Sequence, residues 1–68
     1  MIWTFDKSTL LAEANYTFVA EILTLTFKDG TRHTFLNVPA ETLKALIRAP
    51  SAGLFYMSHI RDQFEQVR

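Results

Sequence analysis

The chain has 68 residues, 49% of them hydrophobic, with six Phe, two Tyr, one Trp and no cysteine. This length allows one domain over residues 1–68, and the lack of cysteine excludes disulfide bonds and thiolate metal sites. Seven basic and seven acidic residues cancel, whereas a nucleic-acid-binding domain usually carries a basic excess. The apolar runs are far shorter than the ~20 residues of a membrane span, and no signal-peptide pattern opens the chain, so we expect a cytoplasmic protein without membrane contact.

The first twenty residues predict one strand and one segment with two possible conformations. Alternation over residues 1–5 is typical of a short strand, and residues 6–9 form a polar break. Residues 10–16 are either a helical turn capped by Ser8 or an extended segment. The alternating set of the strand is Met1, Trp3 and Phe5 on one face against Ile2 and Thr4 on the other.

The centre of the chain predicts a β-hairpin, because apolar and Thr residues alternate on both sides of Asp29-Gly30. A two-residue loop would place Arg32 on the apolar face of the hairpin. A three-residue loop over residues 28–30, with Gly30 in the left-handed conformation, keeps Arg32 on the polar face, and we expect this loop. Its pairs are Phe27 with Thr31, Leu25 with His33, and Leu23 with Phe35.

The last thirty residues predict two helices with a break between them. Asn37 is the expected N-cap of the first helix and Pro39 suits its first turn, while Pro50 ends it near residue 49. Ser51 is the expected N-cap of the second helix. The first helix should bury Leu43, Leu46 and Ile47, with Glu41, Lys44 and Arg48 exposed; the second should bury Gly53, Tyr56, Met57, Ile60, Phe64 and Val67.

These elements together predict an α+β fold, in which a small antiparallel sheet of three to four strands is followed by two C-terminal helices packed on it. An uncovered face of such a short sheet would favour homodimerisation. Gly53 lies on the expected buried stripe, so we favour close backbone packing there over an open first turn that binds an anion.

Catalytic and metal-binding motifs are missing from the sequence. It contains no Gly-rich nucleotide loop, GxSxG or HExxH pattern. His33 and His59 lie in different predicted elements, and His33 is expected to be a partly buried sheet residue. Ser51 lies more than two helical turns from His59, too far for a nucleophile and its base. We therefore expect no enzyme activity, no metal and no cofactor.

The candidate binding surface combines basic residues with apolar residues on the polar side of the second helix. Phe55 precedes His59 by one turn, so the pair could stack a nucleic-acid base or hold a partner side chain. The equal alternative is that the N-terminal strand, with Trp3, covers Phe55. The candidate residues are Arg32, His33, Lys44, Arg48, Leu54, Phe55, His59 and Arg61.

Several short motifs in fixed order resemble those of a known family. They are Tyr16, then Leu23, Leu25, Phe27 and Gly30, then "HTF", "VP" and "L..L..A.S.G..Y...IR". Over about Leu10 to Phe64 the chain resembles the KTSC domain, a small module named for the C-terminus of some lysyl-tRNA synthetases and also found as stand-alone bacterial and phage proteins. The resemblance implies a small α+β fold with no established activity, and RNA binding has been suggested for the family from its synthetase context.

The chain departs from the family pattern where nucleic acid would bind. The family's central Tyr-x-Tyr falls on His33 and Phe35, so the first hydroxyl is replaced by an imidazole. Positions that are often basic are here Ala52 and Leu54, and a common Asn is Met57. The Ser-x-Gly falls on Ser51 and Gly53 and the Ile-Arg on Ile60 and Arg61. Residues 17–20 lack the usual turn residues, which predicts a longer or bulged first hairpin or a continuous strand.

The function expected from the sequence is a small non-catalytic interaction module that binds a protein partner or self-associates. Neutral charge with surplus aromatic and apolar residues supports this expectation. The alternative is an accessory RNA-binding module, and a weaker one is a phage-encoded inhibitor of a host system.

Overall fold

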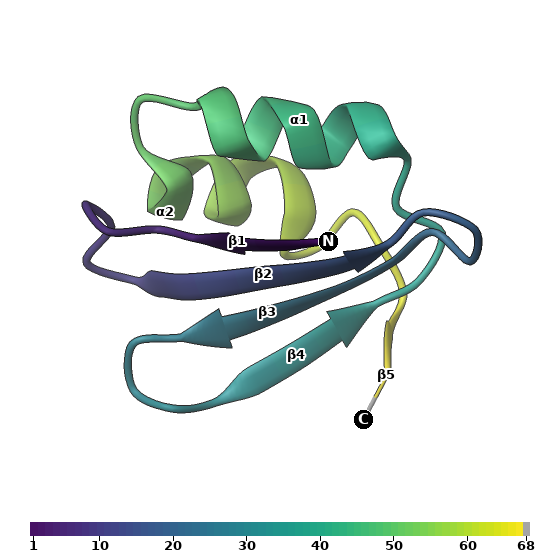
Figure 1. The fold of residues 1–68 in the computed structure, drawn as a ribbon, viewed down its shortest axis with the longest axis horizontal. Coiled ribbons are helices and arrows are strands. Elements are labelled where there is room, and N and C mark those ends of the chain that lie inside the picture. Colours follow the sequence, from purple (N-terminus) through teal and green to yellow (C-terminus); the bar gives the residue numbers. More distant parts are fainter. Residues whose placement is uncertain (68) are drawn as a thin grey trace.

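The computed structural model describes residues 1–67 as a two-layer α+β fold (Figure 1). One antiparallel sheet has the strand order β1-β2-β3-β4-β5, and the helices lie on one of its faces. This confirms the predicted fold class and adds a short fifth strand. The elements are β1 (Ile2–Thr4), β2 (Leu11–Thr17), β3 (Ile22–Phe27), β4 (Arg32–Phe35), α1 (Ala40–Arg48), α2 (Ala52–Phe55), η1 (Tyr56–Ile60, a π-helical turn) and β5 (Gln66–Val67).

The central hairpin has the predicted register. Leu25 pairs with His33 and Leu23 with Phe35, and the Phe27 N–H donates to the Thr31 carbonyl at 2.8 Å. Gly30 has φ 92°, the left-handed conformation that glycine adopts without steric cost. The three-residue loop therefore places Leu23, Leu25 and Phe27 of β3 beneath the helices.

The segment with two possible conformations is extended. Residues 11–17 form β2, and the Ser8 hydroxyl accepts hydrogen bonds from the Leu10 and Leu11 N–H groups at 3.2 and 3.0 Å. Ser8 therefore closes a turn before a strand rather than capping a helix. The hairpin of β2 and β3 has a four-residue loop over residues 18–21, and its pairing is bulged between Leu11 and Glu13.

The start of α1 differs from the prediction, since Asn37 is not its N-cap. Pro39 occupies that position and no side chain caps the helix. Asn37 instead has φ 57°, a left-handed turn that brings the Val38 N–H to the Glu21 carbonyl at 2.9 Å. The chain direction into α1 is thus fixed by a backbone bond to the β2–β3 loop. The break at Ala49 before Pro50 is as predicted.

The second helix begins as predicted, with the Ser51 hydroxyl accepting from the Leu54 N–H at 3.3 Å. Its continuation is different, because the Arg61 N–H bonds to the Tyr56 carbonyl, five residues earlier, and makes η1 a π turn. Each residue of a π turn rotates less about the helix axis than in an α-helix. Met57 is consequently 52% exposed rather than buried, while Tyr56 and Ile60 are buried.

The helix also ends earlier than its expected stripe. Val67 does not continue it: β5 pairs Val67 with Thr34, and the Leu36 N–H donates to the Glu65 carbonyl at 2.8 Å. Val67 is 48% exposed on this strand, whereas Phe64 is half-buried against the core.

The core lies between the sheet and the helices. Tyr16 is its only buried residue with a described hydrogen bond from the side chain, 2.6 Å to the Val38 carbonyl. Within residues 1–67 no helix combines the length and apolar character that crossing a bilayer requires. The buried residues described are Phe5, Leu11, Ala14, Tyr16, Leu23, Leu25, Phe27, Phe35, Val38, Leu43, Leu46, Tyr56 and Ile60.

Candidate interaction surface

The predicted surface residues fall on two sides of the sheet. Arg32 pairs with Thr26 and so faces away from the helices, whereas its neighbour His33 pairs with buried Leu25 and faces them. The other six candidates belong to the helical layer: Lys44 and Arg48 on α1, Leu54 and Phe55 on α2, His59 on η1, and Arg61 just after it. The basic candidates therefore do not form one patch, since Arg32 lies across the sheet from the others.

His33 is a partly buried sheet residue, as predicted. Its ring packs edge-on against Phe27 with centroids 5.0 Å apart. Its Nδ1 lies within hydrogen-bonding distance of the Gln66 side-chain amide on β5. The imidazole thus contacts neighbours on two strands and is held in place by both.

An apolar ridge lies along α2 and η1. Leu54 is 67% exposed and Met57, one turn later, is 52% exposed. Beside them the Phe55 and His59 rings stack on each other, with centroids 4.5 Å apart and planes at 14°. We call these four residues the helical ridge. Phe55 is partly buried against the core, so His59 occupies one face of a ring that would otherwise be available to a base.

The face of the sheet away from the helices is mostly polar. One row crosses all five strands, and its Thr24 and Thr34 hydroxyls lie 3.0 Å apart. None of the outward-facing register positions described in β1 to β5 is aromatic. This face therefore offers neither a base-stacking platform nor a continuous apolar surface. The row consists of Ile2, Asn15, Thr24, Thr34 and Val67.

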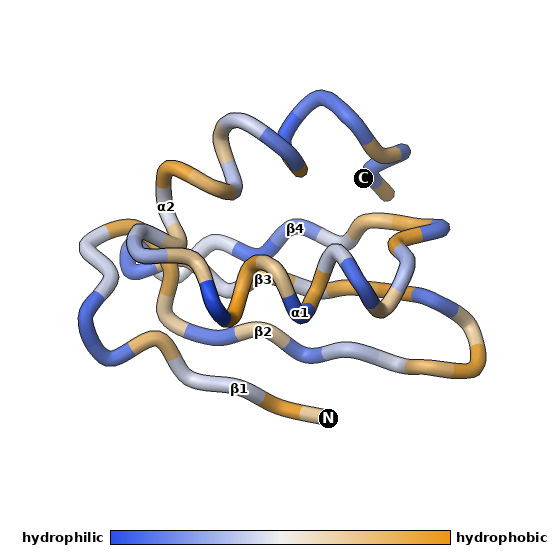
Figure 2. The backbone as a smooth tube through the Cα atoms, turned by 90° about the horizontal axis from the view of Figure 1, so that it is seen from above, coloured by the Kyte–Doolittle hydropathy of each residue, from blue (hydrophilic) through white to orange (hydrophobic). Residues whose placement is uncertain are grey.

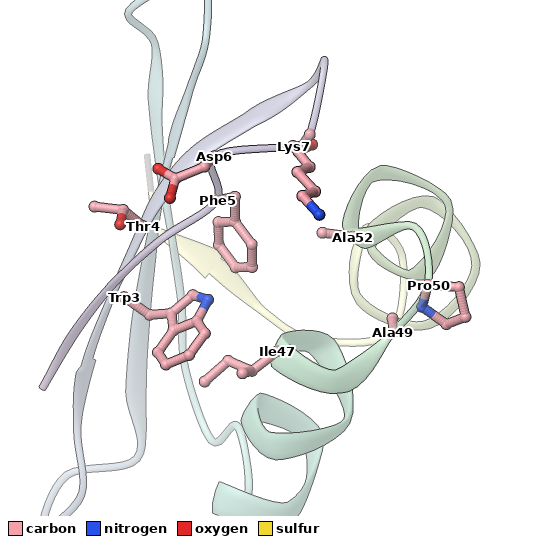
Figure 3. A pocket seen from close by; sticks show the side chains of 10 residues that line it. Trp3, Thr4, Phe5, Asp6, Lys7, Ile47, Ala49, Pro50 and Ala52 are labelled. Carbon is pink, nitrogen blue, oxygen red and sulfur yellow. The ribbon is translucent and has the colours of Figure 1, made fainter.

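A groove beside β1 was missed at the sequence level. Trp3, Phe5 and Lys7 project from one side of the N-terminal segment toward Ile47 and Pro50, and a pocket of about 320 Å³ lies between them (Figure 3). We call this set, with Ala49 and Ala52, the β1 groove. The available signal was the odd-numbered alternation of residues 1–7, which places Lys7 on the same side as Trp3 and Phe5. What could not be read from sequence is that the α1–α2 junction lies opposite them.

Perturbed pKa values occur mainly at structural positions. Burial, with a smaller contribution from Glu21, raises the pKa of Tyr16. Burial is also the main cause of the raised pKa of Tyr56. At the hairpin tip the Thr31 hydroxyl donates to the Asp29 carboxylate at 2.7 Å and lowers the pKa of Asp29. None of these three groups belongs to the β1 groove or the helical ridge. Tyr56 is next to ridge residues in sequence, but its side chain is buried in the core.

Metal-binding geometry is not present among residues 1–67, where no three His, Cys, Asp or Glu side chains lie close enough to hold an ion. Ser51 and His59 have different described neighbours. The Ser51 hydroxyl accepts from the Leu54 N–H in the first turn of α2, and the His59 ring stacks on Phe55.

The fold and its surfaces define a small two-layer α+β domain whose sheet carries helices on one face only. A family model for the KTSC domain matches residues 7–64, and the chain belongs to the KTSC domain family. The crystal structure of a KTSC domain protein from Yersinia pestis superposes with a TM-score of 0.91 at 19% identity, covering 100% of this chain and 94% of that one. No curated protein matches the chain.

The family motif residues are mainly structural in this chain. Val38, Phe35 and Ile60, the last residue of η1, are completely buried. Ser51 caps α2, and Gly53 lies against Leu10. Because the motif positions build the core and its helix junctions, they do not identify a binding site. Arg61, at the end of the motif, is exposed.

Gly53 provides a test of the packing explanation. A methyl group added there would lie 3.3 Å from the Leu10 Cβ, and the Leu10 backbone is held by bonds to Ser8 and Lys28. We expect Gly53→Ala to lower the free energy of unfolding by about 0.5–1 kcal/mol, although alanine favours a helix over glycine by about 1 kcal/mol. Urea denaturation would measure the change.

The control for this prediction is the same substitution in a Leu10→Gly background. Removing the Leu10 side chain removes the close contact, so Gly53→Ala should then be stabilising. A destabilisation of equal size in both backgrounds would contradict the packing explanation.

Proposed function

We propose that this KTSC domain is a non-catalytic interaction module that binds a protein partner through the helical ridge. One observation carries the proposal: Leu54 and Met57 remain exposed on a domain whose core is already closed by other side chains. Exposed apolar side chains that the fold does not need are typical of interaction surfaces. Leu54 lies on α2 and Met57 on η1, and Figure 2 shows α2 beside α1 rather than beneath it.

Nucleic acid is the less supported ligand for this surface. The chain has no basic excess, Arg32 faces away from the helices, and Phe55 is already stacked on His59. The family positions that are often basic carry Ala52 and Leu54 instead. Electrostatic attraction to phosphates supplies most non-specific nucleic-acid affinity, and this ridge offers little of it.

Site-specific photo-cross-linking tests the proposal. With p-benzoylphenylalanine at position 54, expressed in cells that naturally make the chain, we expect a discrete cross-linked product that proteinase removes and ribonuclease leaves intact. The matched control places the same group at Lys28, which is exposed on the hairpin. A product of twice the chain mass would indicate self-association.

Two results would overturn this function. A product at position 54 that disappears on ribonuclease treatment would establish the nucleic-acid alternative. Cross-linking at position 54 no stronger than at position 28 would show that the ridge contacts no partner.

A further inference from the structure

β1 forms an outer edge of the sheet, beside β2 (Figure 2). The Tyr16 N–H bonds to the Met1 carbonyl and the Phe5 N–H bonds to the Ala12 carbonyl. The backbone N–H and C=O groups of the odd-numbered residues in this segment are therefore directed toward β2. Backbone groups alternate in direction along an antiparallel strand. The N–H and C=O groups of Ile2 and Thr4 therefore point outward, where another strand would find them.

The β1 groove lies on the helix side of this same edge. Trp3 packs near Ile47 at one end and Phe5 forms the middle, while Ala49, Pro50 and Ala52 form the opposite wall (Figure 3). Its volume of about 320 Å³ is at the lower limit of the range for small-molecule sites. Most such sites are larger and enclose more of their ligand. Trp3 remains 43% exposed there, although it is one of the largest side chains. The groove is thus an open, largely apolar pocket of side-chain size next to the outer edge of β1.

Two charged side chains, Lys7 and Asp6, line the groove, and they point to different sides of the strand. The Lys7 ammonium points across the mouth toward Ala52, whereas the Asp6 carboxylate points to the other side of the strand, near Thr4 (Figure 3). An anionic group arriving at this mouth therefore meets the ammonium first. This charge selects against a second copy of β1, because its uncharged Ile2–Thr4 segment brings no acid to Lys7.

We propose that the β1 groove binds an extended peptide segment of a protein partner, which adds to β1 as a further antiparallel strand. The segment places an apolar side chain beside Trp3 and an acidic side chain at Lys7. This inference rests on the proposed role as a protein-interaction module and assigns that role a second surface with a defined ligand chemistry. Main-chain bonds to an exposed strand edge, with alternate side chains in pockets, are an established mode of peptide recognition.

The register follows from the free backbone groups. In an antiparallel pair Ile2 and Thr4 each exchange two hydrogen bonds with the peptide, so one peptide residue lies directly opposite Trp3. Its side chain shares the helix-facing side with Trp3, because directly opposed residues lie on the same face of a sheet. The peptide position two residues earlier lies toward Phe5, and the residues before it approach the turn at Asp6 and Lys7. The ligand is therefore an acidic residue followed two to four positions later by an apolar one.

A random linear heptapeptide library displayed on phage provides the probe. Selection on the intact chain should enrich peptides with an acid two to four positions before an apolar residue. Trp3 is the single tryptophan of the chain, so its fluorescence should change as the best synthetic peptide binds. No enrichment, or a consensus without the acid, would overturn the proposal, as would a concentration-dependent fluorescence change without peptide, which would indicate a second copy at the edge.

Charge exchange and edge blocking test the two halves of the site. Lys7→Glu should weaken the selected peptide by at least tenfold, and replacing the peptide's acid with lysine should restore most of the loss. Thr4→Pro removes an outward N–H and should also weaken binding, with folding checked by circular dichroism. The matched charge control is Lys44→Glu on the exposed face of α1, which should leave binding unchanged. Equal losses from Lys7→Glu and Lys44→Glu would contradict the assigned site.

The two proposals fail separately. Met57→Glu should abolish cross-linking from position 54 and leave peptide binding at the groove unchanged. If peptides fail to bind while cross-linking at position 54 persists, the groove assignment is wrong and the interaction module stands.

Discussion

Replacing Ile60 with alanine is expected to lower the free energy of unfolding by about 2–5 kcal/mol, the range for a large aliphatic side chain removed from a closed core. Ile60, the last residue of the π turn, is completely buried, whereas Met57 is 52% exposed. Met57→Ala is therefore expected to change stability by less than about 0.5 kcal/mol. The sequence pattern predicts both side chains to be buried, so the difference between the two variants tests the burial that the structure assigns to each.

Urea denaturation followed by far-ultraviolet circular dichroism would supply both values. Trp3 fluorescence should give the same midpoints, because the domain is small enough to unfold in one transition. Similar losses for Ile60→Ala and Met57→Ala would contradict the exposed position of Met57.

Tyr16→Phe is expected to cost about 1–3 kcal/mol at neutral pH, since it leaves the buried Val38 carbonyl without its 2.6 Å hydrogen bond. The matched control, Tyr56→Phe, leaves that carbonyl bonded and should cost less. The Tyr16 hydroxyl also joins β2 to the segment leading into α1, so this one bond ties the sheet to the helical layer.

The effect of Tyr16 should depend on pH in a defined direction. Burial raises the pKa of Tyr16 in the folded state above its ordinary value near 10. The unfolded chain therefore loses the phenol proton first, so the stability contributed by Tyr16 is complete below pH 10 and is lost as the pH rises above it. The difference between the wild type and Tyr16→Phe should narrow above pH 10. Urea midpoints measured from pH 7 to 11 would check this, and a constant difference would contradict it.

The sheet was predictable because its pattern is local. Alternation around Asp29-Gly30 admitted two loops, and only one placed Leu23, Leu25 and Phe27 together on the buried face. Ser8 was ambiguous for an equally physical reason, because the same hydroxyl caps helices and closes turns. Only pairing with β1 and β3 decides in favour of a strand.

The errors arose where tertiary contacts override the local pattern. The prediction of buried residues in the second helix assumed one helical period from Ser51 onward, but the π turn changes that period between Tyr56 and Ile60. Asparagine is a residue type that is common at helix N-caps. Asn37 instead adopts a left-handed turn, and the Val38 N–H beside it bonds to the Glu21 carbonyl. The predicted hairpin register already placed Arg32 and His33 on opposite faces of the sheet, and the structure confirms it.

The β1 groove was not predictable, because its two walls come from segments about forty residues apart. Lys7 and Pro50 have no sequence relation that signals proximity, and they meet only after the helices fold back over the sheet. A pattern within one element reveals a face, whereas a groove between elements requires the fold.

Within residues 1–67 the two edges of the sheet differ in their neighbours. At one edge β5 pairs with β4 through Gln66 and Val67. At the other edge β1 leaves the backbone groups of Ile2 and Thr4 directed outward. A peptide that adds to β1, as proposed, would extend the sheet on the side remote from β5, so binding would leave the pairing of β4 with β5 in place.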